Sequence, residues 1–216
     1  MSLFAILLGG DVQRTPRLDA ALAGARVIAA DSGIRHADLL GLVPELWIGD
    51  FDSVGDAERV RFAAVEKDVH PADKDHTDGE LAAAAAIARG ATSLIMVGAF
   101  GGPRADHAFL HMTAAIGLAE RGITMLLTSG GEEGIPLMPG AARFDYADGT
   151  LFSVLAFSPL SGLTVAGAKW PLDDVEIAFG SSLTLSNEVR GGLSISLRRG
   201  RALLLAHPQT AAHAAG

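Results

Sequence analysis

The sequence predicts an α/β domain with a mostly parallel sheet, followed by a sandwich-like domain made only of β-strands. In the first 130 residues, short and continuously apolar runs alternate with helix-like segments. Such runs are typical of parallel strands that helices cover on both faces. After about residue 135 the segments become short and β-rich, separated by Gly, Pro, Asp and Asn, and no helical pattern is visible. This change favours an antiparallel sandwich or barrel.

Strands and helices are expected to alternate along the first half of the chain. The expected strands are 4–8, 26–30, 46–48, 93–97 and 124–127. The expected helices between them are 16–23, 34–40, 56–66, 78–89 and 106–121. Alanine fills most of 82–88, which indicates a helix packed closely against its neighbours. The expected β-segments of the second half are FSVLAFS, LTVAG, SLTLSN, LSISLRR and ALLLAH.

The chain is long enough for one large domain or two small ones. It has 216 residues, and 49% of them are hydrophobic, which is enough to form a core. We expect an α/β domain at 1–130 and a β-sandwich domain at 135–207, joined near GGEEGIPLMPG. The last residues, 208–216, are expected to form a flexible tail.

Composition excludes several classes of function. The net charge is −8 and there is no basic run, so a nucleic-acid partner is not expected. The chain has no cysteine, which excludes disulfides, zinc thiolate sites, iron–sulfur clusters and thiol nucleophiles. The N-terminal apolar run is short and lacks a basic segment before it, and no apolar stretch reaches the ~20 residues of a membrane span. We therefore expect a cytoplasmic protein without a membrane partner.

Two acids follow the third expected strand, in the stretch IGDFDS. Asp50 and Asp52 are two residues apart, and in an extended segment this spacing places both side chains on one face. Two hard oxygen ligands at the end of a strand suit Mg²⁺. The alternative is that Asp52 or Ser53 caps the next helix. Two adjacent carboxylates without a cation repel each other, which favours the metal.

Two other stretches lie where an expected strand is followed by a helix. In ADSG, Asp31 is placed to bond a ribose hydroxyl or a metal-bound water, or only to form a turn with a helix cap. In GAFGGPRADH, the glycines allow a ligand to approach the backbone, and Arg104 supplies a charge for phosphate. The alternatives there are that Asp106 only caps the helix and that His107 is only packed or exposed.

The stretch DKDHTDGE precedes the alanine-rich helix. Thr77 and Glu80 form a capping-box pattern, and Asp78 lies in the first turn, where the helix dipole favours a carboxylate. Capping does not explain why Lys74, Asp75 and His76 share this loop. A third metal carboxylate beside a lysine that pairs with phosphate does explain it.

These four stretches are expected at one edge of the sheet, because the carboxyl ends of parallel strands lie together. Three of them carry acids and one carries an arginine. Ligands of open α/β sheets bind at this edge. The sequence therefore indicates a magnesium–nucleotide site, and we find no Ser-His-Asp arrangement that would suggest another chemistry.

The β-rich half contains one further candidate, in GAKWPL. Trp170 is one of two tryptophans. Large aromatic side chains are usually buried, so a core position is the simplest interpretation. The alternative is that its face, beside the polar pair Ser186 and Asn187, stacks on a flat heterocycle.

At this point the chain resembles the thiamine pyrophosphokinase family, through motifs that occur in order over almost its whole length. GDFDS and DHTD, with a later element similar to GRxDH, are the most specific of them. The resemblance implies an α/β nucleotide-binding domain followed by a β-sandwich domain, in a homodimer. It implies transfer of a pyrophosphoryl group from ATP to the hydroxyl of thiamine, which gives thiamine diphosphate and AMP. The motifs are ADSG, PELWIGDFDS, KDHTD, GGPRADH, GAKWPL and SLTLSN.

The resemblance also implies roles for individual residues. The magnesium ligands of the family match Asp50, Asp52 and Asp78, with Asp31 in support. The residues implied in catalysis are Asp50, Asp52, Asp75, Asp78 and Arg104. The residues implied in binding ATP are Asp31, Ser32, Gly33, Lys74, Thr77, Arg104, Asp106 and His107. The residues implied in binding thiamine, in the active site of the partner subunit, are Trp170, Ser186 and Asn187.

The expected chemistry needs charge neutralisation and in-line positioning more than a covalent helper. Mg²⁺ is expected to bridge the ATP phosphates, and Arg104 and Lys74 to stabilise negative oxygens. Either Asp78 or Asp75 is expected to accept the hydroxyl proton.

Two features depart from the family pattern. The family usually has glycine where this chain has Ser32, and Pro103 interrupts the loop before Arg104. Two other functions remain open from the residues alone. One is the same Mg·ATP site acting on another small alcohol, and the other is a nucleotide- or thiamine-binding regulator without catalysis.

Overall fold

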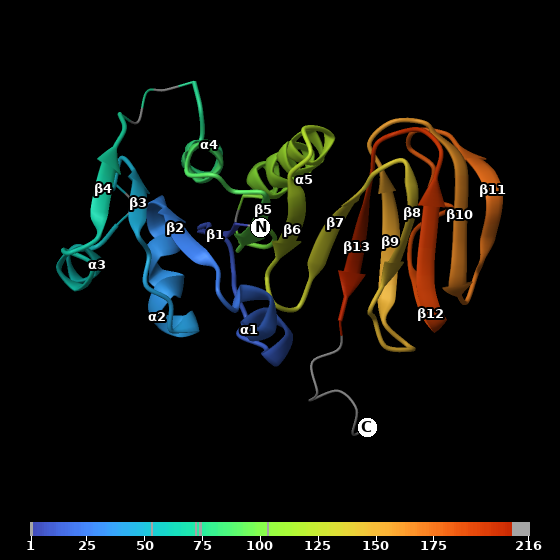
Figure 1. Ribbon diagram of the computed structural model, residues 1–216, viewed down its shortest axis with the longest axis horizontal. Coiled ribbons are helices and arrows are strands. Elements are labelled where there is room, and N and C mark those ends of the chain that lie inside the picture. The colour runs from blue at the N-terminus through green and yellow to red at the C-terminus, as the bar shows by residue number, and fades with distance from the viewer. Residues whose placement is uncertain (1, 53, 72, 74, 103, 209–216) are drawn as a thin grey trace.

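Six parallel strands form the sheet of the N-terminal half (Figure 1). The computed structural model describes residues 2–52, 54–71, 73, 75–102 and 104–208. The strands lie side by side in the order β4-β3-β2-β1-β5-β6, so the chain builds outward from β1 and then returns to its other side. Their bounds are β1 Leu3–Leu7, β2 Arg26–Ala30, β3 Leu46–Gly49, β4 Glu66–Val69, β5 Ser93–Val97 and β6 Thr124–Thr128.

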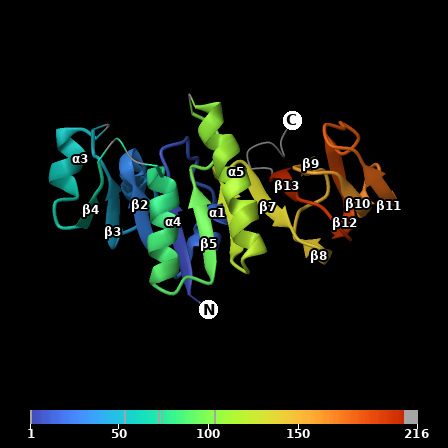
Figure 2. The ribbon, with the colours of Figure 1, turned by 90° about the horizontal axis from the view of Figure 1, so that it is seen from above.

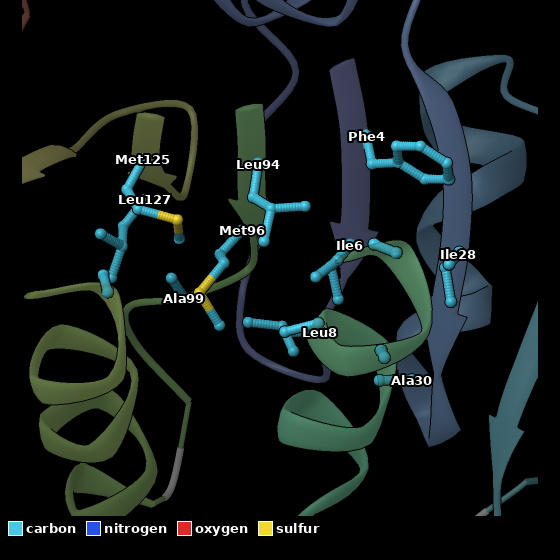
Figure 3. Packing of buried hydrophobic residues seen from close by; sticks show 14 of the residues in the cluster. Phe4, Ile6, Leu8, Ile28, Ala30, Leu94, Met96, Ala99, Met125 and Leu127 are labelled. Atoms are coloured by element: carbon cyan, nitrogen blue, oxygen red, sulfur yellow. The ribbon is translucent and has the colours of Figure 1, made fainter. Parts of the chain in front are cut away.

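Helices cover both faces of this sheet (Figure 2). Alternate residues of β1 point to opposite faces: Phe4 and Ile6 enter one core cluster, which includes residues of α4 and α5, and Leu7 enters the other, which includes residues of α1 and α2. Figure 3 shows the first of these clusters, beside α4 and α5. The helices are α1 Pro16–Leu22, η1 (a 3₁₀-helix) Asp31–Arg35, α2 His36–Leu40, α3 Asp56–Arg61, α4 Asp78–Ala88 and α5 Ala105–Glu120.

The C-terminal half is a β-sandwich whose first sheet continues from the parallel one. β7 pairs antiparallel with β6, and β13, β9 and the start of β12 extend the same sheet. β12 then bends at Gly191 and Gly192, both at positive φ, and enters a second sheet with β8, β10 and β11. A separate core fills the space between the two sheets. The bounds are β7 Glu133–Leu137, β8 Gly140–Phe144, β9 Leu151–Ala156, β10 Leu160–Ala168, β11 Leu172–Ile177, β12 Asn187–Leu197 and β13 Ala202–His207.

The predicted fold class is therefore confirmed, with several local differences, among them the strands β8 and β11, which were not expected. The helix expected at 56–66 ends at Arg61, and β4 begins at Glu66. β4 could not be predicted from an apolar pattern, because all four of its residues are exposed at the edge of the sheet and none is a buried apolar residue. Of SLTLSN only the last residue, Asn187, belongs to a strand, where it begins β12, and the expected linker GGEEGIPLMPG contains β7. Because the sheet runs unbroken from β6 into β7, the division at 1–130 and 135–207 stays a prediction.

A cluster around the buried carboxylate of Glu133 joins the two halves. The carboxylate of Glu133 on β7 accepts hydrogen bonds from Arg17 Nε at 2.7 Å and from Tyr146 Oη at 2.9 Å. The Arg17 guanidinium lies over the Tyr146 ring. Burial raises the pKa of Tyr146, and the neighbouring Glu133 raises it further, so this hydroxyl stays protonated and donates. The cluster ties α1 to the first strand of the β-rich half.

Among the helices of the described residues, none is both long and apolar enough to cross a membrane. The expected tail at 208–216 falls almost entirely outside the described residues.

The alanine-rich helix α4 packs closely on the sheet, as the sequence indicated. Ala82 and Ala86 are fully buried, whereas Ala84 is exposed. We predict that Ala86→Leu lowers the free energy of unfolding by about 1–3 kcal/mol, because the added atoms have no space between helix and sheet. The matched variant Ala84→Leu should change it by less than about 0.5 kcal/mol. Urea unfolding of both variants tests this, and equal losses would contradict the packing described.

Candidate active site

A cavity of about 650 Å³ lies at the carboxyl ends of the central strands. β1 has β2 on one side and β5 on the other. Strands β2 to β4 are added on one side of β1 and strands β5 and β6 on the other, so the order in which the chain adds strands reverses between β1 and β5. Open α/β sheets bind their ligands at such a reversal point. The lining residues are Leu8, Gly9, Gly10, Ala30, Asp31, Ser32, Arg35, Asp50, Asp75, His76, Thr77, Asp78, Gly79, Gly98, Ala99, Gly101, Gly102, Arg104, His107, Ala108 and His111.

Glycines let the strand-end loops approach one another at this point. A Cβ on Gly10 would clash with the carbonyl oxygen of Gly98, and a Cβ on Gly33 would clash with that of Leu7. Gly98 itself has φ 77°, a conformation that favours glycine. The cavity wall is therefore mostly backbone, which a phosphate group can approach closely.

Three side chains hold the loop after β1 in place. Asp11 Oδ2 accepts a hydrogen bond from the amide of Gly102 at 3.0 Å, which joins this loop to the one after β5. The Arg35 guanidinium donates to the carbonyl oxygen of Gly9 at 2.5 Å. The ring of His36 donates from Nε2 to the carbonyl oxygen of Gly10 at 2.8 Å.

Sequence reasoning missed this loop and the cation beside it. The signal that could have found the loop is the glycine pair in LLGGD directly after the first strand. Arg35 lines the cavity and is exposed. It therefore adds a permanent positive charge to the cavity, beyond the charges expected from Arg104 and Lys74.

The IGDFDS stretch turns sharply after β3, because its phenylalanine packs inward. Phe51 has φ 64° and is 7% exposed, and its ring meets Trp47 edge-on at 4.8 Å. Asp50 lines the cavity and its Oδ1 accepts a hydrogen bond from the amide of Asp52 at 2.9 Å. The side chain of Asp52 is exposed, and Asp52 is not one of the described residues that line the cavity. The segment is thus not extended, and the two acids do not share one face in the way expected. Ser53 lies outside the described residues.

Asp31 begins η1 at the end of β2 and lines the cavity. It has φ 44°, and the indole of Trp47 donates to its carbonyl oxygen at 2.9 Å, which fixes this unusual backbone conformation. The hydroxyl of Ser32 lies where a side chain on Gly9 would be, at 2.7 Å from the position of a Cβ. The glycine at position 9 therefore leaves room for the serine that departs from the family pattern.

The amino-terminal end of α4 forms the next side of the cavity. Thr77 Oγ1 accepts from the amide of Glu80, and Glu80 Oε2 accepts from the amide of Thr77 at 2.9 Å, so the predicted capping box is present. The box holds Asp78 in the first turn, and both Asp78 and the exposed Asp75 line the cavity. Lys74 lies outside the described residues.

Arg104 precedes α5 and is paired with Asp106. Its Nε and Nη2 donate to the two carboxylate oxygens at 2.9 and 2.6 Å. This pairing holds the pKa of Asp106 well below its usual range, so the carboxylate stays charged. Asp106 thus orients the guanidinium rather than capping the helix, since the cap residue is Arg104 itself. His107 is exposed and lines the same cavity, and Pro103 lies outside the described residues.

The acids around the cavity fit a magnesium ion that is held jointly with a ligand. Within the described part of the chain, no three His, Asp or Glu side chains are close enough to form a ready-made metal site. Mg²⁺ does not need one, because it keeps several waters and usually takes one or two carboxylates plus substrate phosphates. Asp50 and Asp78 reach the cavity from two different elements and supply oxygen ligands of this kind.

Trp170 is at the surface of the β-rich half. It is 55% exposed, so the core interpretation is wrong, and the buried tryptophan is Trp47. The buried side chain of Asn187 holds its backbone: Nδ2 donates to the carbonyl oxygen of Trp170 at 2.8 Å, and Oδ1 accepts from its amide at 3.1 Å. Ser186 is exposed and has φ 58°. Among the described residues, all that line the cavity lie between Leu8 and His111, so these three lie outside it.

A parallel sheet with a glycine-walled cavity at its reversal point is the architecture of nucleotide-binding α/β proteins. Here a β-sandwich follows it in the same chain. Residues 21–127 match the family described as thiamin pyrophosphokinase, catalytic domain. Residues 143–201 match thiamin pyrophosphokinase, vitamin B1 binding domain. The chain belongs to the thiamin pyrophosphokinase family.

Relatives support this assignment in sequence and in structure. Thiamine pyrophosphokinase of Bacillus subtilis (strain 168) is 32% identical over 168 residues, which is 75% of this chain and 77% of the relative. A crystal structure of the Bacillus subtilis enzyme superposes with a TM-score of 0.83 at 25% identity, covering 96% of this chain and all of that one. Thiamin pyrophosphokinase from Candida albicans superposes with a TM-score of 0.80 over 96% of this chain and 89% of its own. At 13% identity, that likeness shows the fold alone.

Burial of His36 under the Gly10 loop makes stability depend on pH. Burial lowers the pKa of His36 below its ordinary value, whereas the unfolded chain titrates near ~6.5. As the pH falls through that value, the unfolded state takes up more protons, so the free energy of unfolding decreases. We predict a smaller decrease between pH 7.5 and 5.5 for His36→Gln, whose amide can still donate to Gly10. Urea unfolding at both pH values measures it, and an unchanged decrease would contradict this role of His36.

Proposed function

We propose that this chain transfers the pyrophosphoryl group of ATP to the hydroxyl of thiamine, with Mg²⁺, and releases thiamine diphosphate and AMP. Family membership carries the proposal, because both family domains match in the expected order. The cavity supports it, since glycine-walled loops, cations and acids meet at the reversal point of the sheet. We also propose that the reaction takes place in the cytoplasm.

The phosphates of ATP are assigned to the loops after β1 and β5. Backbone near Gly10 and Gly98 can approach phosphate oxygens without interference from side chains. Arg35 and Arg104 line the same cavity and supply two permanent positive charges, with Lys74 as a third in the proposal. These charges matter because the chain as a whole carries −8.

Asp50 and Asp78 are proposed to hold the magnesium ion, with Asp52 and Asp31 in support. When bound, the ion neutralises charge on the phosphate oxygens and fixes their geometry. Asp52 lies just outside the cavity, and its amide is held by Asp50. Of this pair, Asp50 is therefore proposed as the direct magnesium ligand, because it lines the cavity.

The chemical step is an in-line displacement. The thiamine oxygen forms a bond to the β-phosphorus, the bond from that phosphorus to the oxygen shared with the α-phosphorus breaks, and AMP leaves with that oxygen. The hydroxyl proton passes to a carboxylate, for which Asp75 and Asp78 are the candidates. Arg104, oriented by Asp106, faces the developing negative charge.

Thiamine is assigned to the exposed face of Trp170, with Ser186 and Asn187 beside it. An exposed tryptophan whose backbone is fixed by a buried amide presents a rigid surface for an aromatic cation. In one subunit this surface lies outside the cavity of the α/β half. We therefore propose a homodimer in which Trp170 of one subunit completes the site of the other.

Asp50→Asn tests the magnesium and phosphate assignment. We predict a fall in kcat of at least about a hundredfold, because the variant loses a charge that holds the phosphate groups. The matched control is Asp56→Asn, which removes an exposed acid on α3 outside the cavity. AMP formation from ATP and thiamine is the measurement, with circular dichroism to check folding. A folded Asp50→Asn enzyme with normal turnover would refute the assignment.

Trp170→Ala tests the thiamine surface. We predict that the KM for thiamine rises about tenfold or more while the KM for ATP changes little, since stacking on the cation is lost.

Mixing unfolded Trp170→Ala and Asp50→Asn subunits and refolding them tests the shared site. Mixed dimers then carry one intact site each, and about a quarter of the wild-type activity should return when the assay uses thiamine well below the KM of Trp170→Ala. No recovery beyond that of either variant refolded alone would place both residues in the site of one subunit.

A further inference from the structure

A second cavity, of about 590 Å³, lies between α4 and α5. Its walls are mostly apolar, and where the two helices face each other several residues are small: Ala83 and Ala84 come from α4, and Ala114 and Gly117 from α5. Figure 2 shows the two helices side by side over the sheet. The short side chains leave a groove between the helices that a flat molecule can enter. We call this cavity the α4–α5 groove.

The α4–α5 groove is continuous with the polar cavity. Thr77, Gly79 and His111 line both of them, together with His76. A ligand whose charged part lies among the glycine loops can therefore place an apolar part in the groove without leaving the protein surface. A volume of this size and a largely apolar lining are typical of small-ligand pockets.

His111 stands at the junction and has a defined tautomer. Its Nδ1 lies 3.0 Å from the carbonyl oxygen of Ala99, which can only accept, so Nδ1 carries the proton. Nε2 is left as an acceptor and lies beside α4, 3.8 Å from where a Cβ on Gly79 would be. Within the described part of the chain Nε2 has no hydrogen-bond partner. Burial lowers the pKa of His111, so the ring stays neutral near pH 7.

We propose that the α4–α5 groove holds the adenine base of the nucleotide, and that His111 Nε2 accepts a hydrogen bond from the exocyclic amino group. The inference rests on the proposed function, which places the phosphates in the adjoining polar cavity. The small residues of both helices contact the faces of the base, and His111 reads its edge. His111 is thus a specificity-determining residue that distinguishes a 6-aminopurine from purines without that donor.

Equilibrium binding in the absence of thiamine tests the proposal directly. The probes are ATP and purine riboside triphosphate, which lacks only the amino group, each with Mg²⁺ and measured by calorimetry. We expect wild type to bind ATP about tenfold more tightly, because the analogue leaves Nε2 without a partner. In His111→Leu the two affinities should become equal. His111→Gln, whose amide oxygen can accept in place of Nε2, should restore part of the preference.

Ala84→Leu provides a second test that does not alter His111. The added side chain enters the groove from an exposed helix position, so we expect weaker ATP binding in a folded protein. The matched control is Ala20→Leu on α1, which is exposed and outside the groove.

An unchanged ATP preference in His111→Leu, or unchanged ATP binding in Ala84→Leu, would overturn the inference. If Ala84→Leu raises the thiamine KM and binds ATP normally, the groove belongs to thiamine. That result would also overturn the inference. The nucleotide-binding measurements need no turnover. Absence of AMP formation by the wild type would therefore count against the proposed function and not against the base site.

Discussion

The structure depends on the close approach of three strand-end loops at the reversal point of the sheet. The strand order places β1 between β2 and β5, so the loops that leave these strands meet above one short edge. They can meet only because Gly10, Gly33 and Gly98 have no side chains at the contacts. A Cβ at Gly10 or Gly33 would collide with backbone oxygen, which cannot move away as a flexible side chain can. The cavity and its backbone walls follow from this contact.

Burial of aromatic side chains positions the acids on one side of that cavity. Phe51 enters the core against Trp47, and the indole of Trp47 also holds the backbone of Asp31. The turn forced by Phe51 directs Asp50 toward the cavity and leaves Asp52 at the surface. Part of the cost of these two positive-φ residues is offset by the buried aromatic contacts. Core packing and site geometry are therefore coupled through Phe51 and Trp47, which do not line the cavity.

A continuous sheet and an ion pair at the buried Glu133 join the two halves of the chain. β7 continues the sheet from β6, and Glu133 on that strand binds Arg17 of α1. Removing either partner would leave a charged group without compensation in a partly buried place. The surface around Trp170 is thus held at a fixed distance from the cavity of its own subunit, which is consistent with a site completed by a second copy.

The sequence alone determined the fold class, most strands of the parallel sheet and several of the acids that line the cavity, because buried strands and helix caps leave local patterns. Apolar runs marked β1, β2, β3, β5 and β6, and the capping box of Thr77 and Glu80 was readable from residue types. The exposed strand β4 and the strands β7, β8 and β11 lacked such a pattern, so they were missed. Only the tertiary structure decided which side chains share the cavity. Arg35, the loop after β1 and His111 join the site through contacts between distant segments, and the exposure of Trp170 depends on what the rest of the chain covers.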